Sequence, residues 1–187
     1  MHAALIVIDV QKEYFAPWGQ WVLPSGEEAL PKIRTLIETA RAAELPVIHV
    51  VHERLDPQSN VWRPGSEGVE MHPAIQVLPG EIVLKKHVPG SFTGTPLDAH
   101  LRRFSVDTLI VCGFMTFMCC DTTTRQASER GYKVLFASDA TGAKDLVLGN
   151  RTIPYQEVHD VTLAAMTNFA TVLTGAQIAA RIAGTDG

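Results

Sequence analysis

Cysteine is scarce in this chain of 187 residues, which has three cysteines, two of them adjacent. Three thiols do not make a disulfide framework, so we expect a reducing, cytoplasmic compartment. Long hydrophobic runs are also missing. No apolar stretch approaches the roughly 20 residues of a membrane span, and the N-terminus leads into strand-like sequence without the pattern of a signal peptide. A membrane is therefore not an expected partner.

Positive charge is not in excess. Lys and Arg number 16 against 20 Asp and Glu, the formal net charge is −4, and no polybasic run occurs. A nucleic-acid-binding protein needs a basic patch, so we expect no nucleic acid as a partner. Hydrophobic residues make up 46% of the chain and charged residues 19%, which is typical of a globular protein. The length suits one compact domain over residues 1–187.

Short apolar runs alternate with segments of helical periodicity along the chain. The runs predicted to be buried strands are 4–10, 47–51, 82–84, 108–111, 132–137 and 170–173, and the predicted helices are 28–43, 96–104, 119–130 and 156–169. This alternation predicts a three-layer, Rossmann-like α/β fold, in which helices cover both faces of a six-stranded parallel sheet. Segment 56–79 is rich in Gly, Pro, Ser and Asn and is expected to be a long surface loop of the kind that walls a site.

Three chemically distinct side chains follow predicted strands. Asp9 comes at the end of the first, Lys86 after the third, and Cys119 beyond the fourth, where a helix is expected to begin. The carboxyl ends of parallel strands share one edge, where ligands bind, so these groups are expected to converge. There a carboxylate can act as a general base. A lysine and a helix N-terminus would both lower a thiol pKa.

Each of these residues also has a simpler interpretation when it is taken alone. Asp9 would serve as a cap, a lysine at the mouth of a strand is usually solvated, and a cysteine is commonly a small buried hydrophobe. Cys112 and Cys120 are expected to be buried in this way. Lys85 and Lys86 cannot both face the site, because neighbouring strand residues point in opposite directions.

The chain resembles the isochorismatase-like cysteine hydrolases from residue 5 to about residue 173. The first motif of that family is matched by Asp9, Gln11 and Tyr14. The second is matched by Lys86 and the stretch 91–97, whose spacing selects Lys86 over Lys85. The third is matched by Gly113, Thr116, Cys119, Thr123 and Arg125. Three motifs in the expected order make the resemblance specific.

The resemblance implies a catalytic triad of Asp9, Lys86 and Cys119. It also implies a cis peptide bond between Phe114 and Met115, and an oxyanion hole formed by the backbone N–H groups of Met115 and Cys119. The predicted activity is hydrolysis of a C–N bond in a small amide, carbamoyl or ureido compound through a thioester on the cysteine. Two alternatives stay open: a vinyl-ether hydrolase of the isochorismatase type, and a non-enzymatic or redox-sensing protein on the same scaffold.

Further expectations concern the pocket, a metal and assembly. The residues expected to line the substrate pocket are Gln11, Tyr14, Trp62, Phe92, Thr116 and Phe117. Metal-binding members of the family carry an Asp-x-His pattern, but here Val50 stands two residues before His52. We therefore expect no metal and no other cofactor. The resemblance also implies a homodimer or homotetramer.

Overall fold

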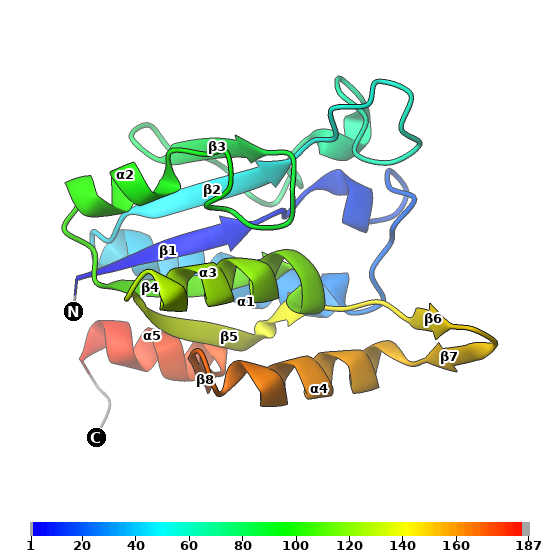
Figure 1. The fold of residues 1–187 in the computed structure, drawn as a ribbon. Helices are drawn as coiled ribbons and strands as arrows, with labels where there is room; N and C mark the ends of the chain where they lie inside the picture. The colour runs from blue at the N-terminus through cyan, green and yellow to red at the C-terminus, as the bar shows by residue number, and fades with distance from the viewer. Residues whose placement is uncertain (1, 185–187) are drawn as a thin grey trace.

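The computed structural model of the protein describes residues 2–184, and its centre is one six-stranded sheet (Figure 1). The strands lie in the order β3-β2-β1-β4-β5-β8, and every neighbouring pair is parallel. Their bounds are β1 Ala3–Ile8, β2 Val47–His52, β3 Ile82–Lys86, β4 Thr108–Phe114, β5 Lys133–Gly142 and β8 Thr171–Leu173. The predicted six-stranded parallel sheet is confirmed.

Helices cover both faces of this sheet, so the predicted three layers are also confirmed (Figure 1). The α-helices are α1 Gly26–Ala42, α2 Leu97–Arg103, α3 Asp121–Glu129, α4 Tyr155–Met166 and α5 Gly175–Ala183. Helices α1 and α5 share one hydrophobic core with the sheet, and α2, α3 and α4 share the other. In none of the helices between residues 2 and 184 is the apolar stretch long enough to cross a membrane.

The central strands are apolar on both faces because both faces are covered. Every residue of β1 and β4 is buried, as expected for strands inside a parallel sheet. The edge strand β3 differs: Leu84 and Lys86 point inward, whereas Val83 and Lys85 are exposed. This alternation has a direct consequence for the site, since only one of the two adjacent lysines enters the protein.

Two parts of the fold were not predicted from the sequence. Helix α5 follows the last strand of the sheet and closes the core beside α1. A short antiparallel hairpin, β6 Leu146–Leu148 and β7 Arg151–Ile153, projects beyond the sheet between β5 and α4 (Figure 1).

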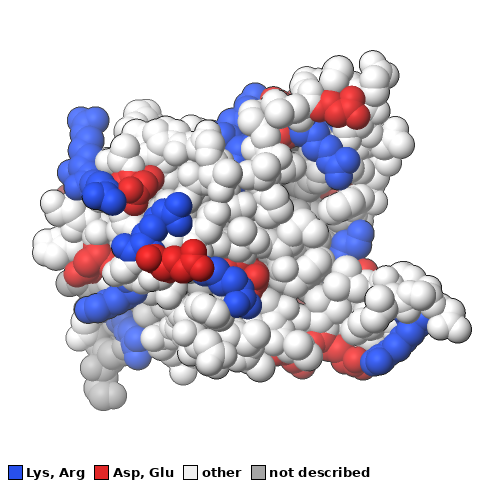
Figure 2. Space-filling view, in the orientation of Figure 1, with Lys and Arg blue, Asp and Glu red and all other residues white. Residues whose placement is uncertain are grey.

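Charged side chains of both signs are interspersed over the visible face of the molecule (Figure 2). No continuous basic patch appears on that face, in keeping with the net charge of −4.

Candidate active site

The ends of three strands bring Asp9, Lys86 and Cys119 into contact. Asp9 directly follows β1, Lys86 is the last residue of β3, and Cys119 lies in the π-helical turn η3 (Thr116–Cys120) that follows β4. The Nζ atom of Lys86 donates to Oδ2 of Asp9 at 2.7 Å and to Sγ of Cys119 at 3.2 Å. The convergence expected from the order of the strands is present in the structure.

Burial sets this cluster apart from the surface ion pairs of the protein. Relative exposure is 0% for Asp9, 1% for Lys86 and 5% for Cys119. The neighbouring Lys85 instead points outward and pairs with Glu53 at 2.8 Å. A buried charge is expensive unless it is paired, so the Asp9–Lys86 ion pair is what allows a carboxylate to lie at this depth.

The carboxylate of Asp9 is held by an unusual backbone conformation. Its φ is +51°, in the left-handed region that non-glycine residues rarely occupy. The backbone N–H of Asp9 donates to the carbonyl of Val50, and the N–H of Gln11 donates to the carbonyl of Asp9, both at 2.8 Å. Strained backbone of this kind is concentrated at functional sites. Among the residues described, Oδ1 of Asp9 is left without a hydrogen-bond partner, and this oxygen is therefore free to accept a proton.

The turn that carries the cysteine requires glycine at its start. Gly113 has a φ of +112°, and a Cβ at this position would collide with the backbone carbonyl of Ile8. The next peptide bond, Phe114–Met115, is cis, as the resemblance implies. Cys119 does not open an α-helix as expected, because α3 begins only at Asp121. Single π-helical turns are frequent at functional sites.

The expected lowering of the thiol pKa was wrong. Burial raises the pKa of Cys119, and the negative charge of Asp9 raises it further against the opposing effect of Lys86. Burial also raises the pKa of Asp9, although Lys86 opposes this. For Lys86, burial lowers the pKa, but the negative groups beside it prevail and its pKa is raised. The resting cluster is thus a neutral thiol beside an ammonium–carboxylate pair.

A cavity of about 370 Å³ opens onto the thiol and the carboxylate. Its lining consists of Asp9, Tyr14, Trp21, His52, Arg54, Leu55, Asp56, Trp62, His87, Pro89, Met118 and Cys119. Tyr14 and Trp62 were expected in this wall, and their rings meet edge to face with centroids 4.7 Å apart. A cavity of this volume is near the lower end of the range for ligand sites, so it fits a small molecule.

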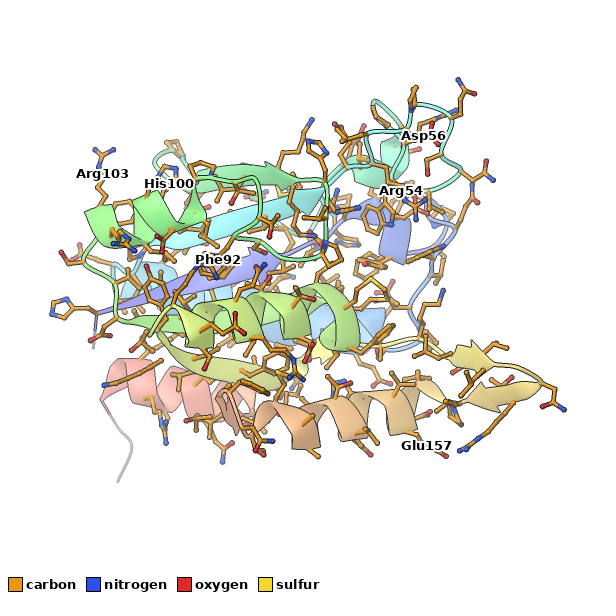
Figure 3. All side chains as sticks on the ribbon, viewed as in Figure 1. Arg54, Asp56, Phe92, His100, Arg103 and Glu157 are labelled. Atoms are coloured by element: carbon orange, nitrogen blue, oxygen red, sulfur yellow. The ribbon has the colours of Figure 1, made fainter. Side chains whose placement is uncertain are left out.

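The other residues expected in the pocket lie behind or beside it. The ring of Phe92 stacks on Tyr132, the residue before β5, and Phe92 belongs to the core that the sheet shares with α2, α3 and α4 and not to the cavity lining (Figure 3). Thr116 bonds through Oγ1 to Nδ1 of His159 at 2.9 Å, and Phe117 packs against the core on the side of α1. These three residues are corrections to the predicted lining.

Gln11 does not line the cavity, but it fixes two of the cavity walls. Its Nε2 donates to the carbonyls of His52 at 2.9 Å and Val69 at 2.7 Å, and its Oε1 accepts from the backbone N–H of His52 at 2.7 Å. One side-chain amide therefore joins the end of β2 to the long loop. Gln11 therefore holds His52 and the long loop in position around the cavity.

Each histidine near the site has its own contacts. His49 is buried and bonds to Glu81 at 3.0 Å, and Glu81 also pairs with Arg41 at 2.7 Å. His52 lines the cavity, and His72 packs against Phe15 with ring centroids 4.4 Å apart. Over residues 2–184, no three His, Cys, Asp or Glu side chains are grouped so that they could hold a metal ion.

Comparison with known proteins shows the family of this chain. Residues 3–177 match the model of the isochorismatase domain. This chain belongs to the isochorismatase family. A relative in the family, YddQ of Bacillus subtilis, is 37% identical over 175 residues, which cover 93% of this chain and 97% of that protein. Nicotinamidase 3 of Arabidopsis thaliana is 28% identical, over 86% of this chain and 78% of that protein.

Solved structures of similar proteins share the fold closely. A cysteine hydrolase from Pseudomonas syringae superposes with a TM-score of 0.91 at 31% identity, covering 98% of this chain and 93% of that chain. The N-carbamoylsarcosine amidase of Thermoplasma acidophilum superposes with a TM-score of 0.78 at 28% identity, covering 94% and 97%. The chain is thus a member of a hydrolase family that includes amidases.

Proposed function

We propose that this isochorismatase-family protein hydrolyses a C–N bond in a small amide, carbamoyl or ureido compound, with Cys119 as the nucleophile. The observation that carries the proposal is the buried cluster itself. Asp9 and Cys119 line one small cavity, and one carboxylate oxygen of Asp9 is unpaired. The ammonium of Lys86 bonds to the other oxygen at 2.7 Å and to the sulfur at 3.2 Å. A nucleophile with an adjacent base that is itself oriented by a third group is the usual arrangement for covalent catalysis.

The first half of the reaction forms a thioester. Asp9 takes the thiol proton, the sulfur of Cys119 attacks the carbonyl carbon, and the carbonyl oxygen becomes an oxyanion. We assign the stabilisation of that oxyanion to the backbone N–H groups of Met115 and Cys119, a type of interaction that typically contributes roughly 3–4 kcal/mol. The C–N bond then breaks as Asp9 returns its proton to the leaving nitrogen.

The second half of the reaction uses water. Asp9, again a carboxylate, removes a proton from a water molecule, and the oxygen attacks the thioester carbon. The C–S bond breaks, the sulfur leaves as a thiolate and recovers a proton from Asp9, and the acid product departs. Lys86 keeps its proton throughout, because the negative charge of Asp9 and the sulfur raises its pKa. Its role is to stabilise the negative charge that moves between the other two groups.

The names of two similar proteins support the choice of bond. Nicotinamidase 3 and N-carbamoylsarcosine amidase are both named for hydrolysis of amide or carbamoyl groups. The cavity of about 370 Å³ favours a substrate of similar small size. The cysteine also favours this chemistry over vinyl-ether hydrolysis, since acyl transfer needs a nucleophile.

The test is ammonia or amine release from a panel of small amides, carbamates and ureides, with a search for the acyl-enzyme by mass spectrometry. We expect turnover of at least one compound and a covalent adduct on Cys119. The variant Cys119→Ala should lose activity, whereas Cys120→Ala, which removes a sulfur buried in the core one residue away, should keep it. Activity that survives in Cys119→Ala would refute the nucleophile, and vinyl-ether hydrolysis in that variant would favour the alternative reaction.

A further inference from the structure

The wall of the cavity at the end of β2 carries a positive charge without an ion-pair partner among residues 2–184. Arg54 is exposed and lines the cavity beyond the last residue of β2. Among the residues described, its side chain donates from Nη1 to Oγ of Ser59 at 3.4 Å. Within residues 2–184, no carboxylate lies within ion-pair distance of this guanidinium, although other arginines, such as Arg41 and Arg125, have such partners.

The backbone of Arg54 is nevertheless well anchored. Its N–H donates to the carbonyl of Trp62 at 2.9 Å, which ties the end of β2 to the long loop. Trp62 itself has a φ of +55°, and its ring lies edge to face with that of His52, at 5.5 Å between centroids. A guanidinium on a fixed backbone with little engagement of its own is well suited to bind a planar anion through two parallel N–H groups.

His52 adds a hydrogen-bond donor to the same wall. Its Nδ1 lies 3.4 Å from Nζ of Lys86. An ammonium has donors only, so Nδ1 faces it as an acceptor and the neutral ring carries its proton on Nε2. Burial, together with the charges of Lys86 and Arg54, lowers the pKa of His52 to about 3, so the ring stays neutral near pH 7. His52 therefore presents a neutral N–H donor.

Besides Asp9, one further acidic residue, Asp56, lines the cavity. Its Oδ1 accepts from the backbone N–H of Gln58 at 2.9 Å, which holds it in the turn of the loop (Figure 3). The charged groups that act on His52 are all basic: Lys86, Arg54 and His87. The wall at His52 and Arg54 is thus electropositive, since the carboxylate of Asp9 is already paired with Lys86.

We propose that Arg54 and His52 form a subsite for a carboxylate, so that the preferred substrates are amides or ureido compounds that carry a carboxylate on the acyl or amine side. This assignment rests on the proposed function, because it places the anion relative to the carbonyl that Cys119 attacks. The loss of one charge-assisted contact of this kind is expected to weaken binding by about 10- to 100-fold. A neutral substrate of equal size gains nothing from the subsite.

The test uses alkylation of Cys119, which needs no turnover. The probes are N-(iodoacetyl)glycine, which is anionic, and its carboxamide, which is neutral and nearly isosteric. Rates of labelling are followed by intact mass, and the site is identified by peptide mapping. We expect the anionic probe to label Cys119 about ten-fold faster than the neutral probe, with saturation. Arg54→Gln should abolish the preference, and Arg54→Lys should restore part of it.

A matched control comes from the same segment. Arg63 is exposed, lies outside the cavity lining and undergoes the same change of charge in Arg63→Gln. This variant should keep the preference for the anionic probe. The proposal is overturned if Arg54→Gln leaves the preference unchanged, if Arg63→Gln removes it equally, or if the cationic probe N-(2-aminoethyl)iodoacetamide labels faster than the anionic one, which would give Asp56 the leading role.

Steady-state kinetics separate this proposal from the proposed function. With 3-ureidopropanoate and butylurea as the charged and neutral ureides, Arg54→Gln should raise KM for the charged compound about 10- to 100-fold and leave kcat nearly unchanged. Hydrolysis without any discrimination between the two compounds would refute the subsite alone. A charge preference in labelling without hydrolysis of any amide would instead refute the hydrolase function.

Discussion

Replacing Lys86 by methionine tests the electrostatic basis of the proposed mechanism. The ammonium of Lys86 touches the sulfur at 3.2 Å and the carboxylate at 2.7 Å, and its side chain has no exposed surface. Methionine is similar in length and removes only the charge and the donors. The same substitution at Lys85 is the matched control, because that side chain is about half exposed and pairs with Glu53 on the surface.

The size of the expected loss in rate follows from the distance between the ammonium and the sulfur. A thiolate and an ammonium 3.2 Å apart, in surroundings with an effective dielectric constant of about 20, attract each other by about 5 kcal/mol. Since each 1.36 kcal/mol changes a rate ten-fold, Lys86→Met should slow thioester formation by about three to four orders of magnitude. Lys85→Met should change turnover by less than about two-fold, because exposed ion pairs contribute roughly 0–1 kcal/mol.

Stability must be measured alongside turnover. Removing one partner of a buried ion pair typically costs about 3–5 kcal/mol, which is less than or comparable to the total stability of many domains. Circular dichroism and thermal unfolding will therefore show whether Lys86→Met is folded at the assay temperature, and single-turnover acylation will isolate the chemical step. A folded Lys86→Met enzyme that retains more than about a tenth of wild-type acylation would refute the reasoning, as would an equal loss in Lys85→Met.

Four further predictions follow from other contacts. Iodoacetamide should label Cys119 before either of the other cysteines, which are both fully buried; peptide mapping checks this, and dominant labelling elsewhere would contradict it. Strong chelators should leave turnover unchanged, and a loss of activity that zinc, iron or manganese restores would show a metal site. The pKa of Glu81 is lowered to about 2 in the fold, where burial is outweighed by its hydrogen bonds and ion pairs, against 4.5 for a free side chain. The stability that it contributes is therefore present above pH 4.5 and lost as the pH falls towards 2, so in urea unfolding Glu81→Gln should show a smaller decline than wild type over this range. Gly113→Ala should destabilise the protein by about 3 kcal/mol or more, since it combines a left-handed backbone with a clash against Ile8; an unchanged melting temperature would contradict this account of the turn.

The arrangement of the sheet could be predicted because its strands are continuous apolar runs. The elements that were missed are short or weakly apolar, yet each carried a local signal. Thr174 and Gln177 form a capping box at the start of α5, and Gly184 ends that helix with a φ of +69°, which is the usual pattern of helix boundaries. The hairpin turns at Gly149–Asn150, a two-residue loop of the type that joins antiparallel strands.

The triad could be placed because its residues lie at strand ends, where a parallel sheet fixes their position. The cavity wall could not, because its residues come from a loop whose path depends on contacts such as that between Gln11 and Val69. His52 and Arg54 had one signal, their place at the carboxyl end of β2, beside the strand that carries Asp9. Phe92 was misplaced because proximity to a motif in the sequence does not show which face of the sheet an aromatic ring covers.

The wrong prediction for the thiol pKa shows how the site is built. Proximity to a helix and a lysine suggested a thiolate, but burial is the largest effect on Cys119, and the nearby carboxylate adds to it. A thiolate of high pKa is intrinsically more nucleophilic than one of low pKa, whereas a neutral thiol is less prone to adventitious oxidation. The proton must then leave as attack begins, and the acceptor has to be in place beforehand. The unpaired oxygen of Asp9 meets that need, which makes the carboxylate as necessary as the sulfur in the proposed reaction.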